Sequence, residues 1–266
     1  MPQRPRLSFS LAVSPGISAL FAEWPMPERL ARARACGFDG IEGPPPSDPA
    51  ALRARLDALG MSFTCMSFAR GAAERGELGI ACLAGRSQDF KDELARTIDT
   101  AAMLGCKQLH PMAGLVPDAS SLARCKDIYL DNLHHACATA AAVGMQILIE
   151  PICAQRQPRY LLQRAAQALE WISEIGASNL SLILDLYHTA AEGESAPRIA
   201  AEHAASIGIV QLAQWPARTQ PAQDDPVLCQ TLAALDEADW HSWICAEYVP
   251  TGPTLHSLDW IRNLHS

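Results

Sequence analysis

The chain has 266 residues, a length typical of one α/β barrel, which needs about 250 residues. Hydrophobic residues make up 49% of it, enough to fill a sizeable core. The formal net charge of −8 and the pI near 5.5, without any basic cluster, argue against a nucleic-acid-binding surface, which is normally basic.

Short apolar runs alternate with longer segments rich in Ala, Leu, Arg and Glu. The runs predict eight strands, at residues 7–13, 40–42, 62–68, 108–111, 146–150, 181–185, 208–213 and 243–248. The intervening segments predict eight helices, at residues 26–36, 49–59, 88–104, 120–143, 160–175, 196–205, 226–238 and 255–264. Eight strands that alternate with eight helices are typical of an α/β fold, the parallel (β/α)8 or TIM barrel.

Glycine follows five of the predicted helices, at Gly37, Gly60, Gly105, Gly144 and Gly176. Glycine tolerates the left-handed backbone that ends a helix before the next strand. The repetition of this turn strengthens the barrel prediction, and no linker, low-complexity tract or charge run divides the chain. We therefore expect a single domain over residues 1–266.

The nine cysteines form no Cys-x-x-Cys pair, and most lie in apolar surroundings, which indicates reduced thiols in a core. The N-terminal region is too short and too interrupted for a membrane span and lacks the layout of a signal peptide. We expect a cytoplasmic protein with no membrane contact.

Polar residues end four of the apolar runs, at Glu150, Asp185, Gln211 and Glu247. In (β/α)8 barrels the chemistry takes place at the carboxyl ends of the strands, where these side chains would converge. Buried carboxylates without partners are costly, so the group needs a common neutralising charge. Oxygen ligands without thiolate suit Mg²⁺ or Mn²⁺, although each acid taken alone could instead cap a helix or pair with arginine.

Four further residues are candidates for contact with a substrate. His188 follows Asp185 in the expected loop and could donate to a substrate oxygen. His110 closes the fourth strand, and Glu42 ends the second, where it could orient a histidine or bind substrate. Arg218, in the loop after the seventh strand, could hold a substrate carboxylate or form a surface salt bridge. The other six histidines, His265 among them, look solvent-facing.

Two carboxylates and a metal suit proton transfer next to a carbonyl. A metal chelated by adjacent substrate oxygens stabilises an enediolate. Glu150 and Glu247, three strands apart in a ring of eight, could stand on opposite sides of that intermediate, one to remove a proton and one to return it. Isomerisation and epimerisation both fit this arrangement.

The sequence resembles the hydroxypyruvate isomerase family of xylose-isomerase-like barrels, which includes 2-oxo-tetronate isomerases. Six segments carry the resemblance. Residues 148–152 are similar to the family's LIEPI motif, 185–188 to D-x-Y-H, 210–213 to VQIA, 247–250 to EYKP, 79–86 to GIACLPGR, and 37–42 to its Gly-Phe segment. The matches extend over almost the whole chain in the same order.

The resemblance implies a metal held by Glu150, Asp185, Gln211 and Glu247, with both glutamates as the acid/base pair. It implies isomerisation of a small hydroxy-carbonyl acid: either hydroxypyruvate is converted to tartronate semialdehyde, or a 2-oxo-tetronate is isomerised. It also implies a homo-oligomer.

The sequence departs from the family pattern in the expected substrate wall. Cys153 and Ser67 replace asparagines, Ile209 replaces a histidine, residues 43–46 replace an aromatic stretch, and residues 215–220 lack the GRHE pattern. These changes leave other functions open: a sugar or ketose epimerase, a dehydratase or other lyase, or a non-catalytic barrel that binds a metabolite. An endonuclease is disfavoured by the acidic charge and the few histidines expected at the mouth.

Overall fold

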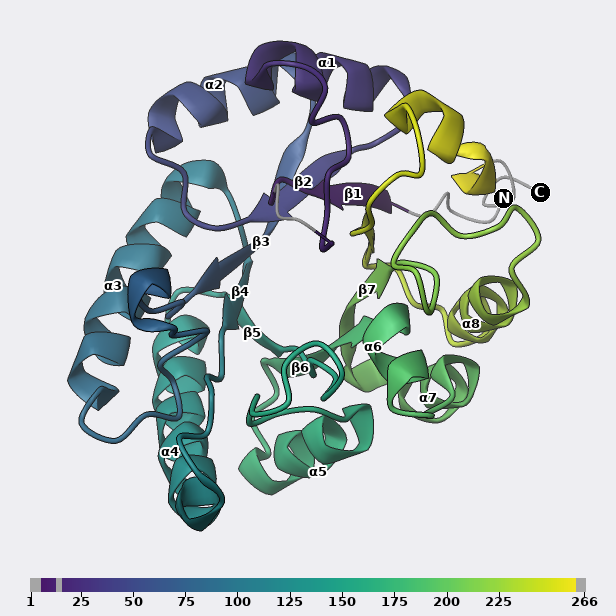
Figure 1. Cartoon of the computed structure of the whole chain (residues 1–266). Coiled ribbons are helices and arrows are strands. Elements are labelled where there is room, and N and C mark those ends of the chain that lie inside the picture. Colours follow the sequence, from purple (N-terminus) through teal and green to yellow (C-terminus); the bar gives the residue numbers. More distant parts are fainter. Residues whose placement is uncertain (1–5, 13–15, 262–266) are drawn as a thin grey trace.

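The computed structural model describes residues 6–12 and 16–261, and this part of the chain forms a closed barrel (Figure 1). The strands are β1 (Arg6–Ser10), β2 (Gly40–Gly43), β3 (Ser62–Phe68), β4 (Gln108–Pro111), β5 (Gln146–Ile149), β6 (Leu180–Asp185), β7 (Ile207–Leu212) and β8 (Trp243–Ala246). Each strand pairs in parallel with the next one along the chain, and β8 closes on β1. The predicted (β/α)8 fold is confirmed.

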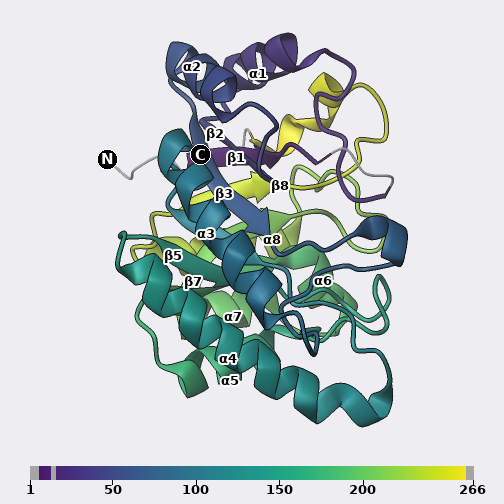
Figure 2. The same cartoon turned by 90° about the vertical axis from the view of Figure 1, so that its left-hand side faces the viewer.

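The helices surround the strands (Figures 1 and 2). They are α1 (Met26–Ala35), α2 (Pro49–Leu59), α3 (Ser87–Leu104), α4 (Leu122–Ala141), α5 (Ala165–Ile175), α6 (Leu186–Ala191), α7 (Ala196–His203) and α8 (Pro226–Glu237), with short 3-10 turns η1 (Ala73–Arg75), η2 (Ala119–Ser121), η3 (Ala204–Ser206) and η4 (Thr254–Ser257). No helix of the described residues is both long and apolar enough to cross a membrane.

Strand side chains alternate between the two faces of the barrel wall, so the apolar residues form two cores. The larger core lies between the strands and the surrounding helices. The smaller one, which we call the inner cluster, consists of Cys65, Leu148, Ile183, Ile209, Trp243 and Cys245. Two members of the inner cluster, Cys65 and Ile183, also line the cavity at the barrel mouth, so this cluster forms part of the cavity's floor.

The glycine turns lie where the sequence predicts them. Gly60, Gly105 and Gly176 end α2, α3 and α5 in the left-handed conformation, with φ of 62°, 67° and 66°. Gly37 and Gly144 also have positive φ. These turns let each helix reverse directly into the next strand. All nine cysteines are free thiols, and most of them are buried, as expected.

The predicted helix at residues 160–175 is wrong in its first turn, because α5 begins at Ala165. The preceding residues are bonded to the loop that follows β4. The Leu161 amide donates to the Gly114 carbonyl, and the Tyr160 hydroxyl accepts from the Ala113 amide. Tertiary pairing therefore overrides the helical pattern there.

Two further differences concern short helices. The segment after β6, expected to be a loop, forms the six-residue helix α6. The helix expected at residues 255–264 is instead the 3-10 turn η4 in its first part. Residues 262–264 of that prediction, residue 13 of the first predicted strand and His265 lie outside the described residues.

Candidate active site

A cavity of about 200 Å³ opens at the carboxyl ends of the strands. Seven of the eight residues singled out in the sequence line it: Glu42, His110, Glu150, His188, Gln211, Arg218 and Glu247. Asp185 lies just behind this lining, with its side chain 1% exposed. The structure therefore brings all eight predicted residues to one place.

Strand register explains the convergence. Asp185 on β6 pairs in register with Gln211 on β7, so their side chains lie at one level of the barrel. Glu150 and Glu247 come directly after the last residues of β5 and β8. Their side chains remain 11% and 12% exposed, so both glutamates reach the cavity. We call Glu150, Asp185 and Glu247 the acidic cluster.

Arg218 is the cation of the acidic cluster. Its Nη2 lies 2.8 Å from Glu247 Oε2 and 3.4 Å from Asp185 Oδ2, and its Nε donates to the Ile17 carbonyl. The residue is 3% exposed, so the surface salt bridge that the sequence allowed is not found. Its φ of 53° is uncommon for a residue other than glycine, and such strained backbone often occurs at functional sites.

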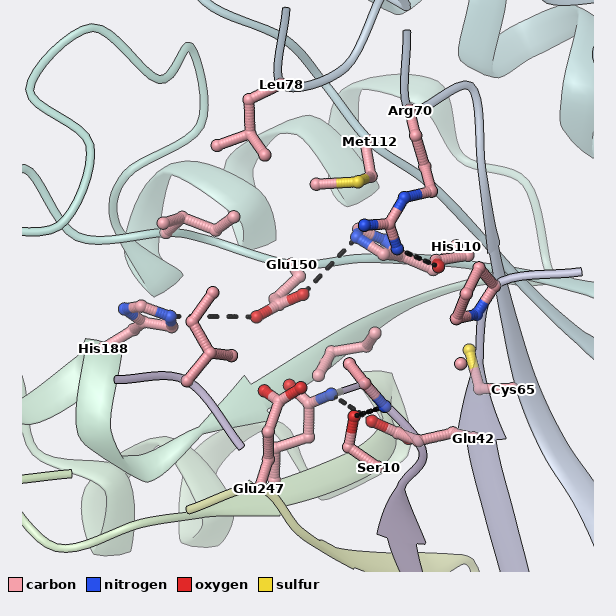
Figure 3. A pocket seen from close by; sticks show the side chains of 18 of the residues that line it. Ser10, Glu42, Cys65, Arg70, Leu78, His110, Met112, Glu150, His188 and Glu247 are labelled. Carbon is pink, nitrogen blue, oxygen red and sulfur yellow. Dashed lines mark hydrogen bonds and ion pairs between the residues drawn. The ribbon is translucent and has the colours of Figure 1, made fainter. Parts of the chain in front are cut away.

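His188 belongs to α6 rather than to a loop. Asp185 Oδ1 accepts a hydrogen bond from the His188 amide and thereby caps this helix. The imidazole Nδ1 accepts from the Cys153 amide at 3.2 Å and lies 3.1 Å from the Cys153 Sγ. The imidazole Nε2 lies 3.9 Å from Glu150 Oε1, as Figure 3 shows. The same atom lies 3.0 Å from Arg218 Nη1.

His110 stands on the other side of Glu150, as Figure 3 shows. Its Nδ1 lies 3.0 Å from the Leu148 carbonyl, which can only accept, so Nδ1 carries the proton. In the neutral ring, Nε2 therefore presents a lone pair toward Glu150 Oε2, 3.4 Å away. Nε2 has no hydrogen-bond partner among the described residues. It can accept a hydroxyl proton from a molecule in the cavity.

Glu42 contacts an amide rather than a histidine, which favours the second expectation for this residue, contact with a substrate. Its Oε1 accepts from Gln211 Nε2 at 2.5 Å. Among the described residues, Glu42 Oε2 and Gln211 Oε1 have no hydrogen-bond partner, although both are buried. Buried polar atoms normally have partners, so this orphaned pair indicates that a further group binds here.

Burial dominates the electrostatics of the site. It raises the pKa of Glu42 to about 8, with a further contribution from the charge of Glu247. Burial and the charges of Glu247 and Asp185 raise the pKa of Glu150 well above its usual range. Burial also raises the pKa of Glu247, although Arg218 opposes that shift. Burial lowers the pKa values of His110 and His188 to about 4, so both rings are neutral at pH 7.

The residues present fit a divalent cation. Glu150, Asp185 and His188 each offer one ligand atom, and these atoms lie within 4.8 Å of one another. The unpartnered Gln211 Oε1 adds an amide oxygen at the same strand level as Asp185. Carboxylate and amide oxygens are ligands that hard divalent cations prefer.

Several cavity residues were not singled out as site residues by the sequence. They include Ser10, Cys65, Arg70, Met112, Arg156 and Gln157. Ser10 ends β1, and Cys65 lies on β3, so strand position alone could have indicated them. The two arginines lie in loops without a periodic pattern, where only the fold places them at the mouth.

The model of the xylose isomerase-like TIM barrel family matches residues 30–264. The chain is 36% identical over 249 residues to a 2-oxo-tetronate isomerase of Cupriavidus necator, which covers 92% of this chain and 95% of that protein. It is 30% identical over 262 residues to a putative hydroxypyruvate isomerase of Mus musculus, with 95% of each chain covered.

Among solved structures, an AP endonuclease of family 2 from Brucella melitensis superposes with a TM-score of 0.89. It is 26% identical and covers 97% of this chain and 98% of its own. L-ribulose 3-epimerase, at 20% identity and a TM-score of 0.74, covers 98% of this chain and 93% of its own and shares the fold. The barrel, its mouth and these chain-long matches agree, and the chain belongs to the xylose isomerase-like TIM barrel family.

Proposed function

We propose that this protein is a metal-dependent isomerase of a three- or four-carbon 2-oxo-3-hydroxy acid, with hydroxypyruvate and a 2-oxo-tetronate as candidate substrates. The observation that carries the proposal is the acidic cluster with two neutral histidines around one small cavity at the barrel mouth. The isomerases among the chain-long relatives support the reaction class.

The size of the cavity favours a small substrate. A protein cavity of about 150 Å³ accommodates benzene, which has six heavy atoms. The cavity of about 200 Å³ therefore suits an acid with three or four carbon atoms better than a long sugar chain.

Isomerisation of hydroxypyruvate needs two proton movements. One proton leaves C3, and a proton is returned to C2 to give tartronate semialdehyde. The hydroxyl proton on the C3 oxygen is lost as the new carbonyl forms, and the C2 oxygen gains a proton. The reaction is balanced without an oxidant or a reductant.

Glu150 and Glu247 are suited to the transfer between carbons. Both reach the cavity from strands on different sides of the barrel, and burial raises both pKa values, which makes each carboxylate a stronger base. His110 is suited to position a substrate hydroxyl, because its unpartnered Nε2 can accept a hydrogen bond from that group.

Glu150, Asp185, Gln211 and Glu247 would hold the cation, and Mg²⁺ or Mn²⁺ suits these oxygen ligands. When bound, the cation would polarise the substrate carbonyl and stabilise the negative charge of the enediolate. For Glu247 to reach a cation, its carboxylate would exchange its contact with Arg218.

The experiment is deuterium incorporation from D₂O, followed by NMR, with Mn²⁺ or Mg²⁺ and hydroxypyruvate or a 2-oxo-tetronate. We expect the protein to exchange the hydrogen bonded to C3 and to form the isomeric product. Glu247→Gln should slow both by at least about 100-fold, because proton transfer by a positioned carboxylate contributes about that much or more. Glu237→Gln, a change at an exposed glutamate that ends α8, is the matched control.

Exchange with inversion at C3 of the tetronate, but without an isomeric product, would identify an epimerase instead. A protein that gains thermal stability from the acid but exchanges no deuterium would be a binding protein. Either result would overturn the isomerase proposal.

A further inference from the structure

Arg70 lines the cavity and belongs to the turn that follows β3. Ala69 and Gly71 on either side of it have φ of 56° and 75°. The Ala69 and Arg70 carbonyls accept hydrogen bonds from the Ile80 and Gly79 amides at 2.9 and 2.7 Å. A left-handed conformation is unfavourable for alanine, so the surrounding structure must hold the turn in place. Strained backbone of this kind is often found at binding sites.

Three arginines line the cavity, and two of them are engaged by the protein. Arg218 is bound to the acidic cluster, and Arg156 Nη2 donates to the Gly16 carbonyl at 2.8 Å. The side chain of Arg70 makes a single hydrogen bond among the described residues, to Ser67 Oγ at 3.4 Å. Glu77, a carboxylate close to this turn, is already paired with Arg86 at 2.5 Å.

Figure 3 shows Arg70 on the same side of the pocket as His110, and Arg70 is exposed while its side chain lines the cavity. Its positive charge contributes to the lowered pKa of His110, after the larger effect of burial. Arg70 and Ser67 thus bring donors to the β3 and β4 side of the cavity, while Asp185 and Glu247 come from β6 and β8.

A small acid bound in this cavity carries a carboxylate that the acidic cluster would repel. The substrate carboxylate is most favourably placed beside a cation whose hydrogen-bond donors are available. A guanidinium can bind a carboxylate through two parallel hydrogen bonds. We propose that Arg70, assisted by the Ser67 hydroxyl, binds the carboxylate of the substrate and so selects acids over neutral sugars. This inference rests on the proposed function, because that function supplies an acid substrate.

The first test measures binding without turnover. Titration calorimetry on the Mn²⁺-loaded protein compares D-glycerate with glycerol, which lacks the carboxylate. We expect Arg70→Gln to weaken D-glycerate binding about 10- to 100-fold and to leave glycerol binding unchanged, because a lost charged hydrogen bond has effects of that size. Arg70→Lys should recover part of the loss, since lysine keeps the charge but not the fork of donors.

Arg75→Gln is the matched control, since Arg75 is exposed on the same loop in η1 and does not line the cavity. Equal losses in Arg70→Gln and Arg75→Gln would show a general charge effect and overturn the proposal. Wild-type protein that binds D-glycerate no more tightly than glycerol would overturn it as well.

The second test separates this proposal from the isomerase proposal. In an active protein, Arg70→Gln should raise KM for the acid about 10- to 100-fold and change kcat by less than about threefold, since Arg70 is not expected to transfer protons. An unchanged KM overturns the role of Arg70 and leaves the isomerase intact. A protein without deuterium exchange whose D-glycerate binding still depends on Arg70 overturns the isomerase and keeps the carboxylate site.

Discussion

The cavity holds buried carboxylates in two different settings. Glu42 on β2 contacts the amide of Gln211 on β7 without a cation, and burial raises the pKa of Glu42 to about 8. Asp185 on β6 and Glu247, which directly follows β8, share the guanidinium of Arg218. The first setting avoids buried charge by keeping a proton, and the second compensates charge with charge.

This difference between the two settings indicates where a cation would bind. Asp185 and Glu247 already share a cation, Arg218, whose place a metal could take, whereas the raised pKa of Glu42 disfavours the ionised form that binds a metal. The setting of Asp185 and Glu247 is therefore suited to the metal, and Glu42 is suited to a hydrogen bond with its neighbour or with substrate. Three substitutions test this comparison.

Arg218→Met should have the largest effect. It leaves Asp185 and Glu247 buried without a cation, which typically costs about 3–5 kcal/mol of folding stability. In the presence of EDTA, the melting temperature measured by calorimetry should fall accordingly. Mn²⁺ should restore much of the loss, because the metal can take over the compensating charge. Arg218→Lys is the control that keeps the charge. Equal Mn²⁺-dependent stabilisation of wild type and Arg218→Met would contradict the idea that arginine and metal compete.

Asp185→Asn should weaken Mn²⁺ binding by at least about 100-fold in titration calorimetry, because it removes a charged ligand. Asparagine still accepts a hydrogen bond at a helix N-terminus, so α6 should keep its cap. Glu42→Gln in the same assay should leave Mn²⁺ affinity nearly unchanged. If both variants lost affinity equally, the two settings would be parts of one metal site and the distinction drawn above would be wrong.

Glu42→Gln should have the smallest effect, and one that depends on pH. The pKa of Glu42 rises from 4.5 to about 8 on folding, so burial disfavours its ionised form. Below pH 4.5 the carboxyl is protonated in both states and the shift costs nothing. The cost grows as the pH rises from 4.5 to about 8 and then stays constant. Compared with wild type in EDTA, the variant should gain stability progressively between pH 4.5 and pH 8 and gain nothing near pH 4. A stability difference independent of pH would show that Glu42 does not keep its proton.

The barrel was predictable from the sequence, because local sequence patterns specify its strands and turns. Alternating apolar runs specify strands, and glycines specify the turns that end several helices. The polar residues at strand ends were also predictable, since strand direction alone brings Asp185 and Gln211 to one level. These features depend on periodicity and on position along a strand.

The remainder of the site depends on tertiary contacts. From the sequence, Arg218 could equally form a surface salt bridge. In the structure it is buried, its φ is positive, and its guanidinium contacts two carboxylates. Helix α6 has six residues and relies on Asp185 as its cap, a bond that no hydrophobic pattern reveals. Arg70 lies in a loop whose left-handed turn is imposed by hydrogen bonds from residues 79 and 80. None of these contacts leaves a local signature.

The two carboxylate oxygens of Asp185 make different contacts, and this links ligand binding to the position of the His188 side chain. Oδ1 anchors the backbone of His188, while Oδ2 faces Arg218. A helix of six residues has little stability of its own, so α6 depends on that anchor and on packing. A rotation of the carboxylate that improved its grip on a cation would loosen the anchor and shift the imidazole. We therefore expect metal binding at Asp185 and the position of the His188 imidazole to be coupled through this one carboxylate.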